Sequence, residues 1–97
     1  CAGCFIDVGC NIKNCTIINN HAIIAHDCLI EDYSQIASGA SLGGYVTIKK
    51  YSFVGIGASI MPNTKVGYSS VVGIGSGTVR NVDDNSTVIG VPARKIL

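Results

Sequence analysis

The 97-residue sequence contains two histidines, and one of them is followed directly by a carboxylate. His26 precedes Asp27, and the apolar residues Ile23 and Leu29 lie on either side of this pair. A histidine beside a carboxylate in an apolar interface is suited to act as a general base, because the carboxylate can orient and polarise the ring. An interface histidine that only makes hydrogen bonds would show the same pattern, so the residues by themselves leave both interpretations open.

A six-residue repeat organises the chain around these side chains. Starting at Ile6, every sixth residue is Ile, Leu or Val, and the residue four positions further on is almost always small. Neither the 3.6-residue period of a helix nor simple strand alternation produces this pattern. It predicts a short strand followed by a corner, with the large residue inside and the small one where the chain bends. The predicted core residues are Ile6, Ile12, Ile18, Ile24, Ile30, Ile36, Leu42, Ile48, Val54, Ile60, Val66 and Val72.

A second period, three hexads long, lies over the first, because the segments that begin at Ala37, Gly55 and Gly73 resemble one another. Three hexads therefore make one coil of triangular cross-section, and residues 6–77 are predicted to form four stacked coils in an all-β, single-stranded parallel β-helix. After Thr78 the phase of the repeat is lost. We expect residues 78–97 to cap the prism, with a last strand over residues 87–91 and a short helix or tail over residues 92–97.

Composition narrows the classes of function. A net charge of +1 with 13% charged residues argues against electrostatic binding to nucleic acid or a membrane surface, and no apolar run approaches the ~18 residues of a transmembrane helix. The sequence begins with cysteine instead of methionine, so we expect one domain of a longer protein. An odd number of cysteines without a signal peptide predicts reduced thiols in the cytoplasm. The five are Cys1, Cys4, Cys10, Cys15 and Cys28, of which the second, third and fifth fall in the small-residue phase of the predicted core.

Apolar residues also occupy positions that should face outward. The residue before each core aliphatic points away from the interior, and Ile17, Ile23 and Leu29 fill three such positions in succession, with Phe53 and Val71 extending the set. A patch of this kind usually marks an interface. We therefore predict an oligomer.

Three segments resemble the hexapeptide-repeat acyltransferases, closest to the sialic acid O-acetyltransferase and UDP-4-amino-sugar N-acetyltransferase family. Residues 20–28 (NHAIIAHDC) look like the segment around the catalytic histidine of that family. Residues 42–48 (LGGYVTI) resemble the next coil, and residues 90–96 (GVPARKI) resemble its terminal Gly-x-Pro-Ala-basic signature. The resemblance covers essentially the whole chain and implies a left-handed coil, a homotrimer and acetyl-CoA as co-substrate, with an N-terminal nucleotide-sugar-binding domain outside this segment.

The resemblance also implies roles for individual residues. His26 would deprotonate an amino or hydroxyl group of a sugar or nucleotide sugar, with Asp27 raising its basicity. Gly44, one predicted coil after His26, would donate its backbone N–H to the thioester oxygen, although a plain turn glycine explains it equally well. The family holds coenzyme A in a groove between subunits, and the corresponding contacts here are Gln35, Ile56, Ile74, Arg94 and Lys95. Relatives often carry a histidine in place of Gln35, and a solvated basic tail is an alternative for the last two.

Two other functions are compatible with parts of the pattern. His21 and His26 have the His-x4-His spacing that also occurs in γ-class carbonic anhydrases, which share the fold and bind zinc through three histidines. The sequence has no third histidine, and Cys1 and Cys4 have no second pair to complete a site, so we expect no metal. A structural β-helix is the other alternative, but the repeated threonine array typical of such proteins is absent. The Gly55-Ile56-Gly57 segment superficially looks like a phosphate loop, yet it keeps the phase of the repeat and precedes no predicted helix.

Overall fold

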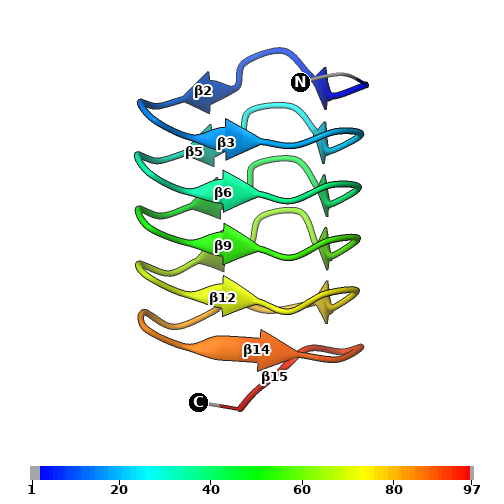
Figure 1. Cartoon of the computed structure of the whole chain (residues 1–97), viewed down its shortest axis with the longest axis vertical. Coiled ribbons are helices and arrows are strands. Elements are labelled where there is room, and N and C mark those ends of the chain that lie inside the picture. The colour runs from blue at the N-terminus through cyan, green and yellow to red at the C-terminus, as the bar shows by residue number, and fades with distance from the viewer. Residues whose placement is uncertain (1–2, 97) are drawn as a thin grey trace.

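Each six-residue repeat forms a two-residue strand and a corner, and three repeats complete one turn of a triangular prism. The computed structural model describes residues 3–96 and measures 31 × 20 × 20 Å. Figure 1 shows the coils stacked along the long axis. The strands of its front face run from left to right while the chain descends from the N-terminal coil, which is the sense of a left-handed coil. The predicted left-handed parallel β-helix is therefore confirmed.

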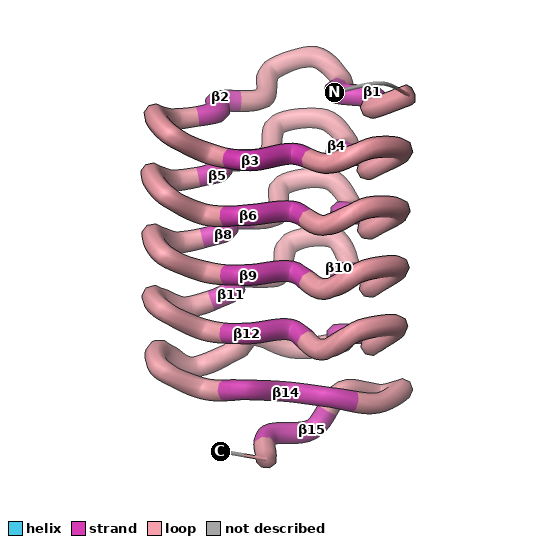
Figure 2. Tube along the Cα trace, in the orientation of Figure 1, coloured by secondary structure: helices cyan, strands magenta, loops and turns pink. Residues whose placement is uncertain are grey.

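Strands that lie three hexads apart pair in parallel and build three faces, which Figure 2 shows as short segments between longer corners. The first face contains β1 (Phe5–Ile6), β4 (Ile23–Ile24), β7 (Ser41–Leu42), β10 (Ser59–Ile60) and β13 (Gly77–Thr78). The second contains β2 (Asn11–Ile12), β5 (Leu29–Ile30), β8 (Thr47–Ile48) and β11 (Lys65–Val66). The third contains β3 (Ile17–Ile18), β6 (Gln35–Ile36), β9 (Phe53–Val54), β12 (Val71–Val72), β14 (Thr87–Ile89) and β15 (Arg94–Lys95).

Three columns of corners connect these faces. The histidine corner (residues 7–9, 25–27, 43–45 and 61–63) joins the first face to the second, and the tyrosine corner (13–15, 31–33, 49–51 and 67–69) joins the second to the third. The glycine corner (19–21, 37–39, 55–57 and 73–75) returns to the first. One residue in each of these corners has a left-handed backbone, with φ between 54° and 63° where it is not glycine. This conformation is costly for side-chain-bearing residues, so their contacts must offset it.

The predicted core forms, but it is complete only from the second coil onward. The aliphatic residues from Ile24 to Val72 are buried. Ile12 and Ile18 are half-buried, and Ile6 is 47% exposed. The prediction that Ile6 is a core residue is therefore wrong, because no coil among the described residues covers the N-terminal side of the first turn.

The small residues at the corners anchor one coil to the next. Several use a thiol or hydroxyl to donate a hydrogen bond to a carbonyl of the following coil. Cys10 Sγ donates to the Ala25 carbonyl at 3.0 Å, and Ser52 Oγ donates to the Gly67 carbonyl at 2.6 Å. Thiols and hydroxyls thus satisfy carbonyl groups that the sharp bend turns away from the strand ladder. Cys28 is buried as predicted, whereas Cys4 and Cys10 are half-buried in the open first coil.

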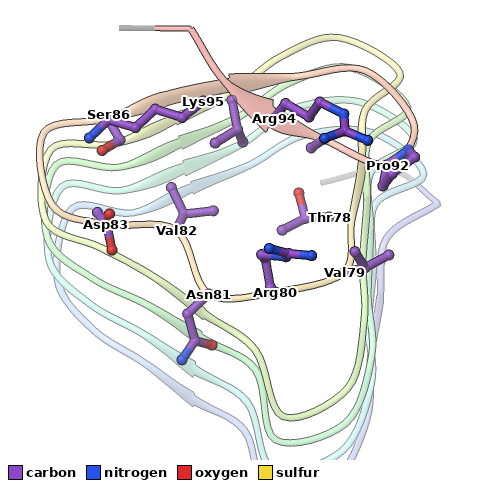
Figure 3. Close-up of a pocket in the computed structure, with 12 residues that line it drawn as sticks. Thr78, Val79, Arg80, Asn81, Val82, Asp83, Ser86, Pro92, Arg94 and Lys95 are labelled. Carbon is purple, nitrogen blue, oxygen red and sulfur yellow. The ribbon is translucent and has the colours of Figure 1, made fainter.

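The repeat resumes after Thr78, with two residues missing. Val82 forms a β-bridge with Val66, and Val88 pairs with Val72. In each pair, the sequence separation is two residues shorter than a full coil of three hexads. Figure 3 shows this shortened segment cutting inside the outline of the other coils. The predicted loss of phase after Thr78 is therefore confirmed, and what the sequence did not predict is that the repeat continues in a register shifted by two residues.

The C-terminal segment forms neither a helix nor a free tail. After β14, the chain turns and β15 pairs antiparallel with it, joining Ile89 to Arg94 and Val88 to Lys95. The Ala93 N–H donates to the Gly77 carbonyl at 2.8 Å, which ties the turn to the first face. These bonds give the segment a backbone partner that local sequence does not reveal. Residues 3–96 contain no helix long and apolar enough to cross a membrane.

The outward apolar residues do not form the single patch that their succession in sequence predicted. Successive hexads lie on successive faces, so Ile17 is on the third face, Ile23 on the first and Leu29 on the second. The residues that share one face are three hexads apart, and on the third face Phe53 pairs with Val71. Apolar surface is therefore spread around the prism.

Candidate functional site

His26 and Asp27 form a pair at the histidine corner, immediately after β4. His26 Nδ1 lies 3.2 Å from Asp27 Oδ2, and the two side chains are 50% and 42% exposed. His26 points outward, as its position two residues after a core aliphatic predicted. When Nδ1 carries the proton and donates it to the carboxylate, Nε2 keeps a lone pair that can accept a proton from a bound molecule.

Glycines in the two neighbouring coils make room for this pair. A Cβ on Gly44 would lie 2.6 Å from both Cε1 and Nε2 of His26, so any side chain there would displace the ring. A Cβ on Gly9, one coil earlier, would collide with Asp27 Oδ1. The predicted alignment of Gly44 with His26 is confirmed, whereas the sequence reasoning missed Gly9. The spacing of three hexads from Gly9 to Asp27 is the signal that would have found it.

The backbone of Gly44 lies next to the His26 ring. Its Cα lies over the edge of the ring that carries Nε2, because the imagined Cβ touches that atom. Among residues 3–96, the Gly44 N–H donates to no protein acceptor, while its carbonyl accepts from the Asn63 N–H at 2.9 Å. A hydrogen-bond donor beside the candidate base is the arrangement that oxyanion stabilisation requires.

Tyr45 is a member of this site that the sequence reasoning did not single out. Its ring meets the His26 ring edge-on, with centroids 5.2 Å apart and planes at 89°. Tyr45 has φ 60° and is 58% exposed. The signal in the sequence is positional, because Tyr45 follows Asp27 by three hexads and therefore lies at the same corner.

Cys28 supports the site from inside the prism. Its Sγ donates to the Gly43 carbonyl at 3.2 Å, one residue before Gly44. Burial raises the pKa of the Cys28 thiol, so the group stays neutral and acts as a donor at physiological pH. The role is structural, since a thiol that is buried and protonated is a poor nucleophile.

The residues assigned to coenzyme contact lie elsewhere on the chain. Ile56 and Ile74 protrude from the glycine corner, at the opposite edge of the first face from His26, and are 54% and 71% exposed. Gln35 is half-buried on the third face, between Ile17 and Phe53. One chain therefore does not bring these residues together with His26 and Gly44.

Arg94 and Lys95 lie at the C-terminal end of the prism, on β15. They line a cavity of about 310 Å³ together with Arg80 and the shortened segment of the last coil. Figure 3 shows that Arg94 and Lys95 extend to opposite sides, so their charges do not converge. The hydroxyl of Thr78 is buried in this region without a hydrogen-bond partner. Thr78 occupies the position of a core aliphatic, where the interior offers no acceptor.

The geometry separates the two histidines. His21 lies at the glycine corner, beside Gly3 of the preceding coil, and His26 lies at the other end of β4. In the described part of the chain, no three His, Cys, Asp or Glu side chains cluster in a way that could hold a metal ion. Cys1, the partner of Cys4 in the Cys-x2-Cys spacing, lies outside the described residues.

Three solved structures that are similar to this chain are acetyltransferases. A perosamine N-acetyltransferase from Caulobacter crescentus, in a mutant with one histidine replaced by alanine and in complex with CoA and GDP-perosamine, is 31% identical with a TM-score of 0.98. The match covers 99% of this chain and 46% of that one. The acetyltransferase domain of PglB from Neisseria gonorrhoeae, in complex with acetyl coenzyme A, is 34% identical with a TM-score of 0.96, covering 98% of this chain and 46% of the other.

A more distant match has a different kind of acceptor. A serine acetyltransferase from Brucella abortus, in complex with coenzyme A, is 30% identical with a TM-score of 0.84, and the match covers 91% of this chain and 39% of that one. The present chain thus spans less than half the length of these three proteins. A scan against protein-family models and a search of curated protein sequences gave no match.

Proposed function

Because the chain belongs to the hexapeptide-repeat β-helix acyltransferases, we propose that it is the catalytic domain of an acetyltransferase acting on a sugar or nucleotide sugar. The donor is acetyl-CoA and the acceptor is an amino or hydroxyl group. The observation that carries the proposal is the His26–Asp27 pair beside the Gly44 backbone. It is supported by structural relatives that hold CoA together with GDP-perosamine, or acetyl coenzyme A.

In the proposed reaction, His26 is the general base. Its Nε2 takes a proton from the acceptor nitrogen or oxygen as that atom attacks the thioester carbonyl carbon. The carbon–sulfur bond then breaks, and the thiolate of CoA leaves with a proton, returned from His26 in the simplest case. Asp27 holds Nδ1 and stabilises the positive charge that the ring acquires.

Gly44 supplies the complementary electrostatic contribution. Its N–H stabilises the negative charge that develops on the thioester oxygen during attack. The absence of a side chain at Gly44 lets the carbonyl approach both this N–H and Nε2 of His26. Base and oxyanion donor thus come from the same corner in successive coils.

Coenzyme A is proposed to bind between subunits of a homotrimer. Ile56 and Ile74 protrude from a different corner from His26, so a second chain must bring that ridge to the histidine corner of the first. Ile56 and Ile74 would contact the pantetheine arm and Gln35 a further part of the coenzyme. Arg94 and Lys95 would meet its phosphates, one at a time, because they extend in opposite directions. The free thiols of Cys4, Cys10, Cys15 and Cys28 fit a reducing cytoplasm.

The test measures thioester cleavage by the full-length protein with acetyl-CoA, with and without an acceptor. GDP-perosamine offers an amine, and a GDP-sugar that carries only hydroxyl groups separates N- from O-acetylation. Replacing His26 by asparagine should lower kcat/KM by about 10²–10⁴-fold, the usual contribution of a general base. His21→Asn is the matched control and should retain activity.

Two results would contradict the proposal. One is His26→Asn turning over acetyl-CoA as fast as His21→Asn. The other is activity that disappears on EDTA dialysis and returns with zinc, which would favour the carbonic anhydrase alternative. Sedimentation of the full-length protein tests the homotrimer separately.

A further inference from the structure

Tyr45 contacts the candidate base His26 through both its ring and its backbone, and the proposed reaction gives it no role. Its ring stands at 89° to the His26 ring with a centroid separation of 5.2 Å. The Tyr45 N–H also donates to the His26 carbonyl at 3.0 Å, so backbone and side chain both join the same pair of residues.

The contact between Tyr45 and His26 forms although the backbone of Tyr45 is in a left-handed conformation. Tyr45 has φ 60°, a conformation in which a bulky side chain is uncommon. The equivalent positions of the glycine corner carry Gly39, Gly57 and Gly75, which accept this conformation easily. Strained residues of this kind persist where surrounding contacts hold them.

Tyr33 and Tyr51, at the tyrosine corner, provide the internal comparison. They have φ 61° and 60°, and their rings stack on each other 5.3 Å apart. Tyr45 has no such aromatic neighbour in its own column, where Asp27 and Asn63 flank it. The Tyr45 ring instead packs against the His26 ring.

We propose that Tyr45 is a positioning residue for His26. Three groups surround the imidazole, with Asp27 at Nδ1, the Gly44 backbone over Cε1 and Nε2, and the Tyr45 ring edge-on. Because the His26 side chain is half exposed, Asp27 alone leaves it room to swing outward. Tyr45 closes that path and keeps Nε2 beside the Gly44 N–H. This inference rests on the proposed role of His26 as the base.

The experiment compares three variants of the full-length enzyme. Tyr45→Asn removes the ring and keeps a residue suited to positive φ. It should lower kcat by about threefold to tenfold, the size of effect expected for the loss of one aromatic edge contact. The KM for acetyl-CoA should stay within about twofold, since Tyr45 is not among the proposed contacts of the coenzyme. Tyr45→Phe retains the ring and should keep kcat at the wild-type value.

Tyr33→Asn is the matched control, because it makes the same substitution at the same φ and nearly the same exposure, 55% against 58%. It should leave kcat unchanged. Equal losses of kcat in Tyr45→Asn and Tyr33→Asn would overturn the proposal, because the effect would then come from the backbone of the coil. A rise in KM with unchanged kcat would also overturn it and make Tyr45 a substrate contact.

A spectroscopic measurement separates this inference from the proposed reaction. The ring-proton resonances of His26 should shift in Tyr45→Asn and stay near their wild-type values in Tyr45→Phe and Tyr33→Asn, because an adjacent aromatic ring shifts them. If the wild type has no acetyltransferase activity, the proposed function fails, yet these spectra still report whether the Tyr45 ring lies against His26 in solution, which the inference requires. Unchanged His26 resonances in Tyr45→Asn would overturn the inference.

Discussion

The histidine corner and the tyrosine corner have the same backbone and use it differently. Both repeat once per coil, and both place residues with φ near 60° at the bend. At the tyrosine corner, polar and aromatic groups satisfy one another. Asp32 Oδ1 accepts the Asn14 N–H at 2.9 Å, and the rings of Tyr33 and Tyr51 stack.

At the histidine corner, the polar groups remain available to a ligand. His26 uses one nitrogen for Asp27, and no side chain of the next coil covers its other nitrogen, because the residue that faces it there is Gly44. The corner backbone is therefore a scaffold that does not by itself create a site. Removing a side chain at Gly44 is as important to the site as placing one at His26.

Adding a single methyl group at Gly44 should have the largest effect on this contrast. Gly44→Ala has no backbone strain to overcome, because Gly44 does not have a positive φ, but its Cβ would lie 2.6 Å from the His26 ring. Displacing the base by ~1 Å should reduce kcat/KM by about 100-fold. Lys50→Ala, at the equivalent position of the tyrosine corner, is the control and should retain activity. Steady-state kinetics of both variants would disprove this prediction if Gly44→Ala stayed near wild type.

Thiol reactivity should distinguish the interiors of the two corners. Cys15 is exposed at the tyrosine corner, whereas Cys28 is buried behind the histidine corner and burial raises its pKa. A raised pKa leaves less thiolate at a given pH, so alkylation of native Cys28 at pH 8 should be slower by about an order of magnitude or more. Mass spectrometry of the labelled peptides measures both rates, and urea should abolish the difference. Equal rates in the folded protein would contradict the buried position of Cys28.

Ser52→Ala should destabilise the fold without affecting chemistry. Its hydroxyl is buried and donates to the Gly67 carbonyl at 2.6 Å. Removing it leaves that carbonyl without its partner, which should lower the free energy of unfolding by about 1–3 kcal/mol. Ser59→Ala, at an exposed position, is the control for urea unfolding and should change stability by less than ~0.5 kcal/mol. A loss of kcat at a temperature where Ser52→Ala is folded would contradict this prediction, because Ser52 would then affect the reaction as well as stability.

Tyr51→Asn should have the smallest effect, because two contributions oppose each other. The substitution removes contacts with Tyr33 and Tyr68, each worth ~0.5–1.5 kcal/mol. It also relieves a left-handed conformation that costs a tyrosine ~1–2 kcal/mol. The net change in unfolding free energy should be within ~1 kcal/mol. A loss well beyond that in thermal or urea unfolding would show that the stacked tyrosines hold the coils together.

The sequence predicted those features of the site that depend on the repeat itself. His26 faces outward at a corner, Asp27 is beside it, and Gly44 lies in the next coil, because each position follows from counting in hexads and in sets of three hexads. Tyr45 and Gly9 follow the same arithmetic, but their importance becomes visible only when the ring of His26 has a position. The separation of Ile56 and Ile74 from His26 requires knowing on which corner each hexad ends.

The hexad pattern alone predicts the repeat, the inward aliphatic residues from Ile24 onward and the placement of His26 beside Asp27. Only the folded chain shows that Ile17, Ile23 and Leu29 lie on different faces, that the last coil is two residues short, and that β15 returns along β14. The physical reason is the range of the interactions. Whether a side chain points inward depends on its own hexad, whereas its neighbours in space belong to the coils before and after it, which are distant in the sequence.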